Sequence, residues 1–192
     1  IHILGESAGS QTIFRYDGQS YSGEEFLSQV DFYNALWNTG SAHIAYHAKL
    51  QPASGKLTHS QLTMSRLSEG KSNSFRVGDI HADAGGSVFI TGKNSYQMAN
   101  RAAQRINSQY IGAYHGDPSL LAVSPNYQNR HAWTSFSQDM GTGMGKAIAT
   151  DNNKVVALFD AEEGQFFTTS NAAYSSGSGV YLAVLPIHGN FK

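Results

Sequence analysis

Arg15 is the first residue in this chain whose type and setting favour a chemical role. It lies in the short apolar, β-prone run TIFRYD at 12–17, and Asp17 follows it two residues later. A cation on a strand among aromatic residues is uncommon unless it binds a carboxylate, a phosphate or a ring. Arg15 is therefore a candidate for binding a nucleotide phosphate. An ion pair with Asp17, with a glutamate or with the chain end is the alternative.

Three short motifs match known functional sequences, but their surroundings argue against those functions. The residues GESAG at 5–9 have the letters of a hydrolase nucleophile elbow, but only four residues precede them, so we interpret them as a glycine-rich turn. GDIH at 78–81 matches the first metal motif of calcineurin-like phosphatases without the downstream ligands. We expect a solvated loop there, with an adventitious metal site as the alternative. GTGMGK at 141–146 lacks the spacing of a phosphate-binding loop, and we expect a flexible loop.

The spacing of the histidines does not predict a metal site. His43 and His47 lie in the run 42–50, in which apolar residues alternate with the rest. This alternation predicts a half-buried strand with both histidines on the face opposite to Ile44 and Tyr46. Residues four apart on a strand are separated by about 13 Å, which is too far for one metal ion.

The expected elements indicate one α+β domain over 1–192, with mixed or antiparallel sheets and a few helices. Ser22 has capping-box spacing to a glutamate, and apolar residues recur at helical intervals up to Gly40, which predicts a helix. A second helix is expected to begin at Asn94 or Ser95 and to extend to Ile106.

The strands are expected in two groups. The segment 42–67 is expected to form a β-hairpin with a turn at 52–55, and a strand is expected at 86–91. The last third of the chain is expected to form a meander. Its strands are predicted at 147–150 and 154–159, joined by a turn at 151–153, and at 166–169 and 180–187.

Composition excludes several classes of protein. The net charge is −1 and charged residues make up 14% of the 192 residues, so the chain lacks the basic footprint of a nucleic-acid or anionic-lipid binder. No apolar run approaches the roughly 20 residues that cross a bilayer. The absence of cysteine excludes disulfides, thiolate metal sites and cysteine nucleophiles. The chain begins at Ile1, which a removed signal peptide or a trimmed start would explain, and we expect a secreted protein.

Several segments, taken in order, resemble the ADP-ribosyltransferase A subunits of the cholera and pertussis toxins. FRYD at 14–17 is similar to the first strand of that family. WNTG at 37–40 precedes His43 as a loop precedes the family's histidine, with His47 as the second match. SVFITGK at 87–93 is similar to its Ser-Thr-Ser strand, where only Thr91 keeps a hydroxyl. SQDMG at 137–141 and NAAY at 171–174 are similar to its Glu-x-Glu and Asn-x-x-Tyr elements. The hairpin at 42–67 would then be an insertion.

The resemblance implies an ADP-ribosyltransferase-like fold that uses NAD as its substrate and modifies an unidentified protein acceptor. No metal is implied. The matching positions are Arg15, Asp17 and Thr91 for NAD binding, and His43, Ser137 and Asp139 for catalysis.

Two of these positions depart from the family pattern. Asp139 is one methylene shorter than the family's second glutamate, and a misplacement of about 1 Å can cost on the order of 100-fold in rate. Ser137 cannot act as a base alone. The resemblance therefore implies an enzyme that is weakly active or degenerate, with transfer to protein impaired more than NAD cleavage.

Two functions of different classes follow. The first is an NAD-dependent mono-ADP-ribosyltransferase-like catalytic domain of a toxin or effector, secreted or delivered into a target cell with binding subunits. The second is a secreted non-enzymatic binding module, such as an adhesin, a lectin-like domain or a haem-binding protein. Its basis is Trp37, Trp133, ten tyrosines and eight histidines, which supply stacking surfaces or an axial ligand. Convergence of the Arg15, His43, Thr91 and Asp139 side chains on one cleft favours the enzyme, and scattered positions favour the binding module.

Overall fold

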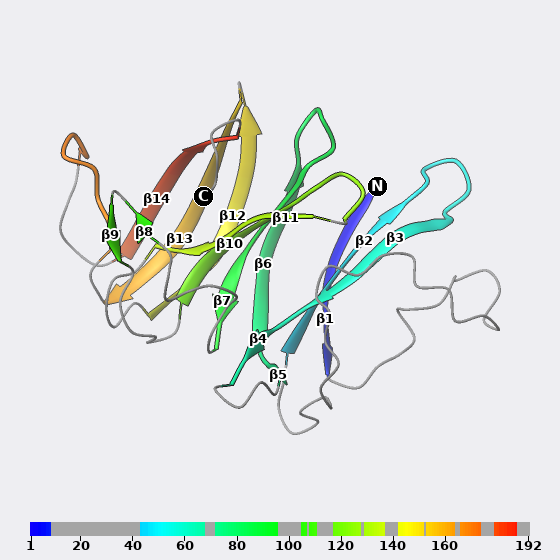
Figure 1. The fold of residues 1–192 in the computed structure, drawn as a ribbon, viewed down its shortest axis with the longest axis horizontal. Coiled ribbons are helices and arrows are strands. Elements are labelled where there is room, and N and C mark those ends of the chain that lie inside the picture. The colour runs from blue at the N-terminus through cyan, green and yellow to red at the C-terminus, as the bar shows by residue number, and fades with distance from the viewer. Residues whose placement is uncertain are drawn as a thin grey trace.

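The described part of the chain is built from antiparallel β-strands. The computed structural model describes residues 1–8, 43–67, 72–95, 105–106, 108–110, 117–127, 129–136, 142–151, 153–163, 166–173 and 179–187. Within these ranges every regular element is a strand, and every strand pairing is antiparallel (Figure 1).

The α+β prediction is therefore wrong for the described residues, which form an all-β structure. The first expected helix, 22–40, lies outside them. The second was expected to start at Asn94 or Ser95, but Asn94 is the last residue of a strand and pairs with Phe75 on one side and Asp117 on the other. Ile106, expected at the end of that helix, pairs in a short ladder. Hydrogen bonding to two neighbouring strands thus overrides a local capping signal.

The strands form three main sheets and two short ladders. The first sheet has the order β1-β2-β3, the second β11-β10-β7-β6 and the third β12-β13-β14. The first sheet comprises β1 (His2–Ala8), β2 (His43–Leu50) and β3 (Leu57–Thr63). The second comprises β6 (Phe75–Ala82), β7 (Val88–Asn94), β10 (Asp117–Val123) and β11 (Arg130–Ser135). The third comprises β12 (Thr142–Asp151), β13 (Lys154–Glu163) and β14 (Gly179–Pro186). The ladders pair β4 (Ser65–Arg66) with β5 (Ser72–Asn73) and β8 (Arg105–Ile106) with β9 (Gln109–Tyr110).

Two hairpins confirm predictions from turn residues. The β2–β3 hairpin turns at 52–55, where Gly55 has a φ of 68°. The β12–β13 hairpin turns at Asn153, with a φ of 63°. Both residue types tolerate the left-handed backbone that such turns require. The C-terminal meander is also confirmed, except that the expected strand at 166–169 is only a single bridge at Phe166.

Three segments expected as turns or loops are strands. Residues 5–8 belong to β1, 78–81 to β6 and 142–146 to β12. Two of their glycines have a packing role instead of a turn role. A Cβ added to Gly78 would lie 1.9 Å from the carbonyl oxygen of Gly145, and one added to Gly145 would lie 2.3 Å from Thr91 Cβ. The backbone of β12 therefore crosses directly over β6 and β7.

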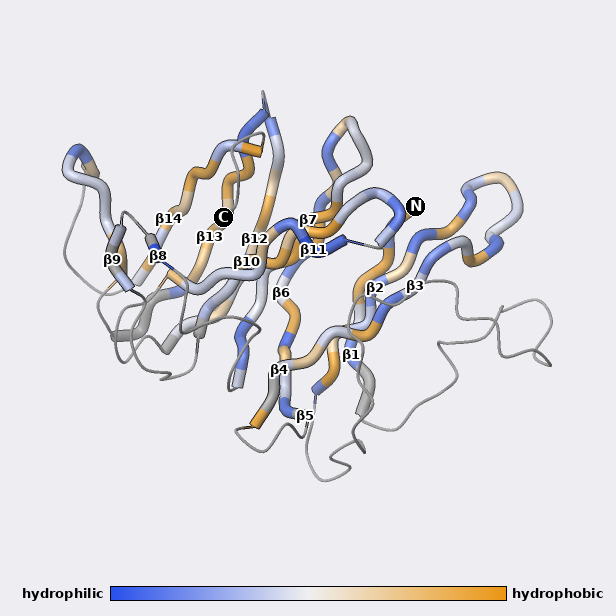
Figure 2. Tube along the Cα trace, in the orientation of Figure 1, coloured by the Kyte–Doolittle hydropathy of each residue, from blue (hydrophilic) through white to orange (hydrophobic). Residues whose placement is uncertain are grey.

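The second sheet lies between two hydrophobic clusters. Alternate residues of β7 and β10 point to opposite faces, as the strand period requires. Val88, Ile90 and Leu121 join one cluster, and Phe89 and Leu120 join the other. The inner face of the third sheet covers the latter. In Figure 2 the orange, hydrophobic segments lie along strands of all three main sheets.

Strand β2 is buried on both faces, so the prediction of a half-buried strand is wrong. Its residues from Ile44 to Ala48 are all buried, including His47 on the face expected to be exposed. That face is covered by Tyr127, whose ring centroid lies 5.0 Å from that of His47. Because Tyr127 is 80 positions further along the chain, the local alternation could not reveal this cover.

Candidate functional site

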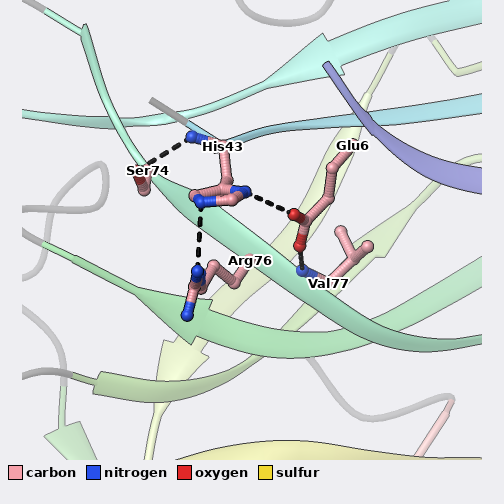
Figure 3. Close-up of polar contacts among 5 residues, drawn as sticks. All are labelled: Glu6, His43, Ser74, Arg76 and Val77. Atoms are coloured by element: carbon pink, nitrogen blue, oxygen red, sulfur yellow. Dashed lines mark hydrogen bonds and ion pairs between the residues drawn. The ribbon is translucent and has the colours of Figure 1, made fainter. Parts of the chain in front are cut away.

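An exposed polar cluster joins the first and second sheets (Figure 3). Glu6 comes from β1, His43 begins β2, and Arg76 lies near the start of β6. Strands β1 and β6 are edge strands of their sheets and contact each other here. The cluster therefore depends on the way the two sheet edges meet.

Hydrogen bonds fix the His43 ring on both sides. Its Nδ1 lies 2.6 Å from Glu6 Oε2, and its Nε2 lies 3.0 Å from Arg76 Nη2. The other carboxylate oxygen of Glu6 accepts a 2.9 Å bond from the backbone N–H of Val77. The backbone N–H of His43 donates to Ser74 Oγ at 3.0 Å.

These contacts define the protonation of His43. A guanidinium group has only donors, so His43 Nε2 must accept the hydrogen bond from Arg76. The ring proton therefore lies on Nδ1, which donates to Glu6. In this arrangement the imidazole is neutral, and each carboxylate oxygen of Glu6 accepts one hydrogen bond, from His43 Nδ1–H and from the Val77 N–H.

The same contacts give the Arg76 guanidinium no direct carboxylate partner among the described residues. Within the described segments Arg76 makes no ion pair, and the atom that holds its guanidinium is a neutral nitrogen of His43. Arg76 is exposed, and only one of the five N–H donors of a guanidinium is used by this bond. An exposed, oriented guanidinium can bind a carboxylate, sulfate or phosphate through two parallel hydrogen bonds.

The structure places two of the predicted site residues, His43 and Thr91, in different environments. His43 belongs to the exposed cluster, whereas Thr91 is fully buried on β7, beside Gly145 at the crossing of β12. Thr91 Oγ1 has no hydrogen-bond partner among the described residues. His43 and Thr91 thus belong to different sheets and do not share a site. The other four predicted site residues, Arg15, Asp17, Ser137 and Asp139, lie outside the described residues.

Sequence reasoning did not identify Glu6 or Arg76. Glu6 was noticed only as a letter of the GESAG motif, and no local pattern singles out Arg76. Their partner His43 lies 37 and 33 positions away from them. The β1–β2 ladder brings Glu6 to His43, and the contact between the β1 and β6 edges adds Arg76. Nothing in the local sequence around each residue indicates these contacts.

A second histidine cluster packs around Tyr127 on the first sheet, with His47 fully buried and His2 and His59 partly buried. The ring of Tyr127 lies 5.0 Å from that of His47, 5.9 Å from His59 and 6.2 Å from His2, measured between centroids. Burial, and then the charge of His2, lower the pKa of His47 to about 3. Its Nε2 lies 3.3 Å from Thr63 Oγ1, and its Nδ1 has no hydrogen-bond partner in the described part of the chain. Since His47 is fully buried, this cluster has a packing role.

No model of a known protein family, no curated protein and no solved structure matches this chain. In the segments that the structure describes, no three histidine, aspartate or glutamate side chains are placed to hold a metal ion. The same segments contain no helix with the length and hydrophobicity that a bilayer crossing requires. The function is therefore argued from the geometry of the exposed cluster.

Proposed function

We propose that this protein is a secreted, non-enzymatic binding domain that recognises an anionic group of its partner through Arg76. One observation carries the proposal: in the part of the chain that the structure describes, a neutral nitrogen of His43 and not a carboxylate holds the exposed guanidinium. The charge of an arginine that is paired with a carboxylate is already compensated. Arg76 is oriented by an uncharged ring, so its charge remains available to an anion. Glu6 acts through His43, because its bond to Nδ1 determines which ring nitrogen faces Arg76.

The cluster is better suited to binding than to catalysis. A general base needs a free lone pair within reach of its substrate. Both ring nitrogens of His43 are engaged, so His43 would have to release Arg76 before accepting a proton or binding haem iron. What the cluster offers without rearrangement is a cation with unused hydrogen-bond donors.

The NAD-dependent transferase or glycohydrolase stays a prediction. Four of its six site residues lie outside the described residues, and Thr91 is buried away from His43. NAD nevertheless carries a pyrophosphate, and a guanidinium suits that group as it suits other phosphates. The same experiment can therefore test both functions.

The test is calorimetric titration of the protein with phosphate, with sulfate and with NAD. Arg76→Ala removes a charge-assisted hydrogen-bond donor worth about 1.5–3 kcal/mol. We expect it to weaken anion binding by about 10–100-fold. Arg76→Lys should recover only part of the affinity, because an ammonium group cannot copy the planar fork. Lys56→Ala is the matched control, since it removes an exposed cation from the far turn of the β2–β3 hairpin.

Equal anion binding by the wild type and Arg76→Ala would contradict the proposal. If NAD binds much more tightly than phosphate and is slowly hydrolysed, the catalytic function is favoured over the binding module. If NAD binds no better than phosphate and is not consumed, the binding module is supported.

A further inference from the structure

Strand β14 is an uncharged edge strand. Among the described strands it is the last in the order β12-β13-β14 and lies at the outer edge of that sheet (Figure 1). Its residues, GVYLAVLP at 179–186, include no acidic or basic side chain. It pairs with β13 without a register shift from Pro186 to Gly179. It therefore has neither the charge nor the bulge by which edge strands usually discourage pairing with another chain.

The outward side chains of β14 are aliphatic and exposed. Val180 is 74% exposed, Leu182 57% and Val184 53%. Three of the six exposed large hydrophobic residues among those described thus lie on one face of a single strand. Their partners across the β13 ladder include Leu158 and Val156, so the apolar face continues onto the next strand. Apolar side chains on this face can pack against those of a further strand added at the edge of the sheet.

The sequence of β14 is complementary to itself in one register. The segment VYLAV at 180–184 reads the same at its outward positions in both directions, as Val, Leu, Val. In an antiparallel pair centred on Leu182, Val180 of one copy lies opposite Val184 of the other. On the inner face the large Tyr181 lies opposite the small Ala183, so the side chains of the two copies fit around each other. No like charges meet, because the strand has none.

From this we infer that β14 is the homodimer interface of the protein: two copies pair their β14 strands antiparallel about a two-fold axis at Leu182. The third sheet of one copy then joins the third sheet of the other into one continuous sheet. Each copy uses its own β14 edge, so the contact is closed and stops at two copies. The inference is independent of the Arg76 site, which lies between the first and second sheets.

The expected dimer is dissociable. Stable homodimers usually bury more than about 2,000 Å² in total, whereas an interface built on one strand falls at the low end, below about 1,200 Å². We therefore expect a dissociation constant of about 10–100 µM, with monomers at about 1 µM. Sedimentation equilibrium over this concentration range measures it directly.

Charge substitutions at Leu182 test the register. Leu182→Lys places two ammonium groups opposite each other at the axis, and we expect the dissociation constant to rise more than about tenfold. When it is measured by itself, Leu182→Glu should raise the dissociation constant by a similar factor. A mixture of the Leu182→Lys and Leu182→Glu proteins should recover dimers, because each lysine then faces a glutamate.

A pair of double variants tests the antiparallel direction. Val180→Lys with Val184→Glu in one chain places opposite charges across the axis and should keep the dimer. Val180→Lys with Val184→Lys should remove it. Ile3→Lys, on the exposed edge of β1, is the control that should leave the dimer unchanged. Thermal melts of each variant at about 1 µM check that the monomer is folded.

Three results would overturn the inference. The first is a wild type that stays monomeric at about 1 mM. The second is a dimer that Leu182→Lys leaves intact or that the lysine–glutamate mixture does not recover. The third is growth into larger assemblies or fibres, because a closed two-fold pair cannot continue.

Discussion

Two histidines on one strand have opposite fates in this protein. His43 and His47 are four residues apart on β2 and were expected on the same exposed face. His43 is exposed at the sheet junction and has partners at both ring nitrogens, whereas His47 is fully buried with one nitrogen unpartnered among the described residues. The same residue type therefore has two roles on one strand. His43 orients the exposed Arg76 of β6, whereas His47 packs in the core beneath Tyr127.

The comparison predicts unequal costs of truncation. His47→Ala should lower the free energy of unfolding by about 2–4 kcal/mol, because the buried ring packs against Tyr127. His43→Ala should cost less than about 1 kcal/mol, since its contacts are exposed. Urea denaturation of both variants measures the difference. Equal costs would mean that the two regions do not differ as described.

Acid should destabilise the fold through His47. Its pKa in the folded protein, about 3, lies below the ordinary value of 6.5, so the unfolded chain takes up the proton first. The contribution of His47 to the free energy of unfolding is therefore fully present above about pH 6.5. It falls by at most about 1.4 kcal/mol per pH unit as the pH decreases toward 3. His2 and His59 act in the same direction, because burial also lowers their pKa values.

The variant His47→Phe isolates this contribution. It keeps an aromatic ring beside Tyr127 but cannot titrate. Unfolding free energies measured by urea between pH 7 and pH 5 should depend less steeply on pH in His47→Phe than in the wild type. An unchanged slope would place the acid sensitivity elsewhere.

Gln61 on β3 is a second buried polar residue next to His47. It lies directly opposite His47 in the β2–β3 ladder, and neither its amide oxygen nor its amide nitrogen has a partner among the described residues. A buried unsatisfied polar group costs about 1–3 kcal/mol. Gln61→Leu should therefore raise the unfolding free energy by about 1 kcal/mol. A loss of stability would show that a bound water or another group satisfies the amide.

The sequence predicted those parts of the fold that depend on neighbouring residues. The turns at Gly55 and Asn153 follow from residues that tolerate a left-handed backbone, and the strands beside them follow from alternation. The segments at 78–81 and 142–146 were misjudged because glycine usually marks a loop. In this protein Gly78 and Gly145 allow two strands to cross at backbone distance.

The site could be predicted only in part for the same reason. His43 was identified from a family resemblance, but its partner Glu6 comes from the neighbouring strand β1 and its partner Arg76 from the edge of the second sheet. Thr91 has a hydroxyl at a suggestive sequence position, yet its strand is central in a sheet that is covered on both faces. Burial by distant strands leaves no signal within a short window of sequence.

The central claim is that a neutral His43 holds Arg76 with its charge available to an anion. Nitrogen NMR of the histidine and arginine side chains during a sulfate titration tests it most directly. We expect the His43 ring to be protonated at Nδ1, and the Arg76 guanidinium signal to shift in a saturable way that the Arg130 signal does not follow. A doubly protonated His43, or an Arg76 signal that shifts no more than that of Arg130, would contradict the account.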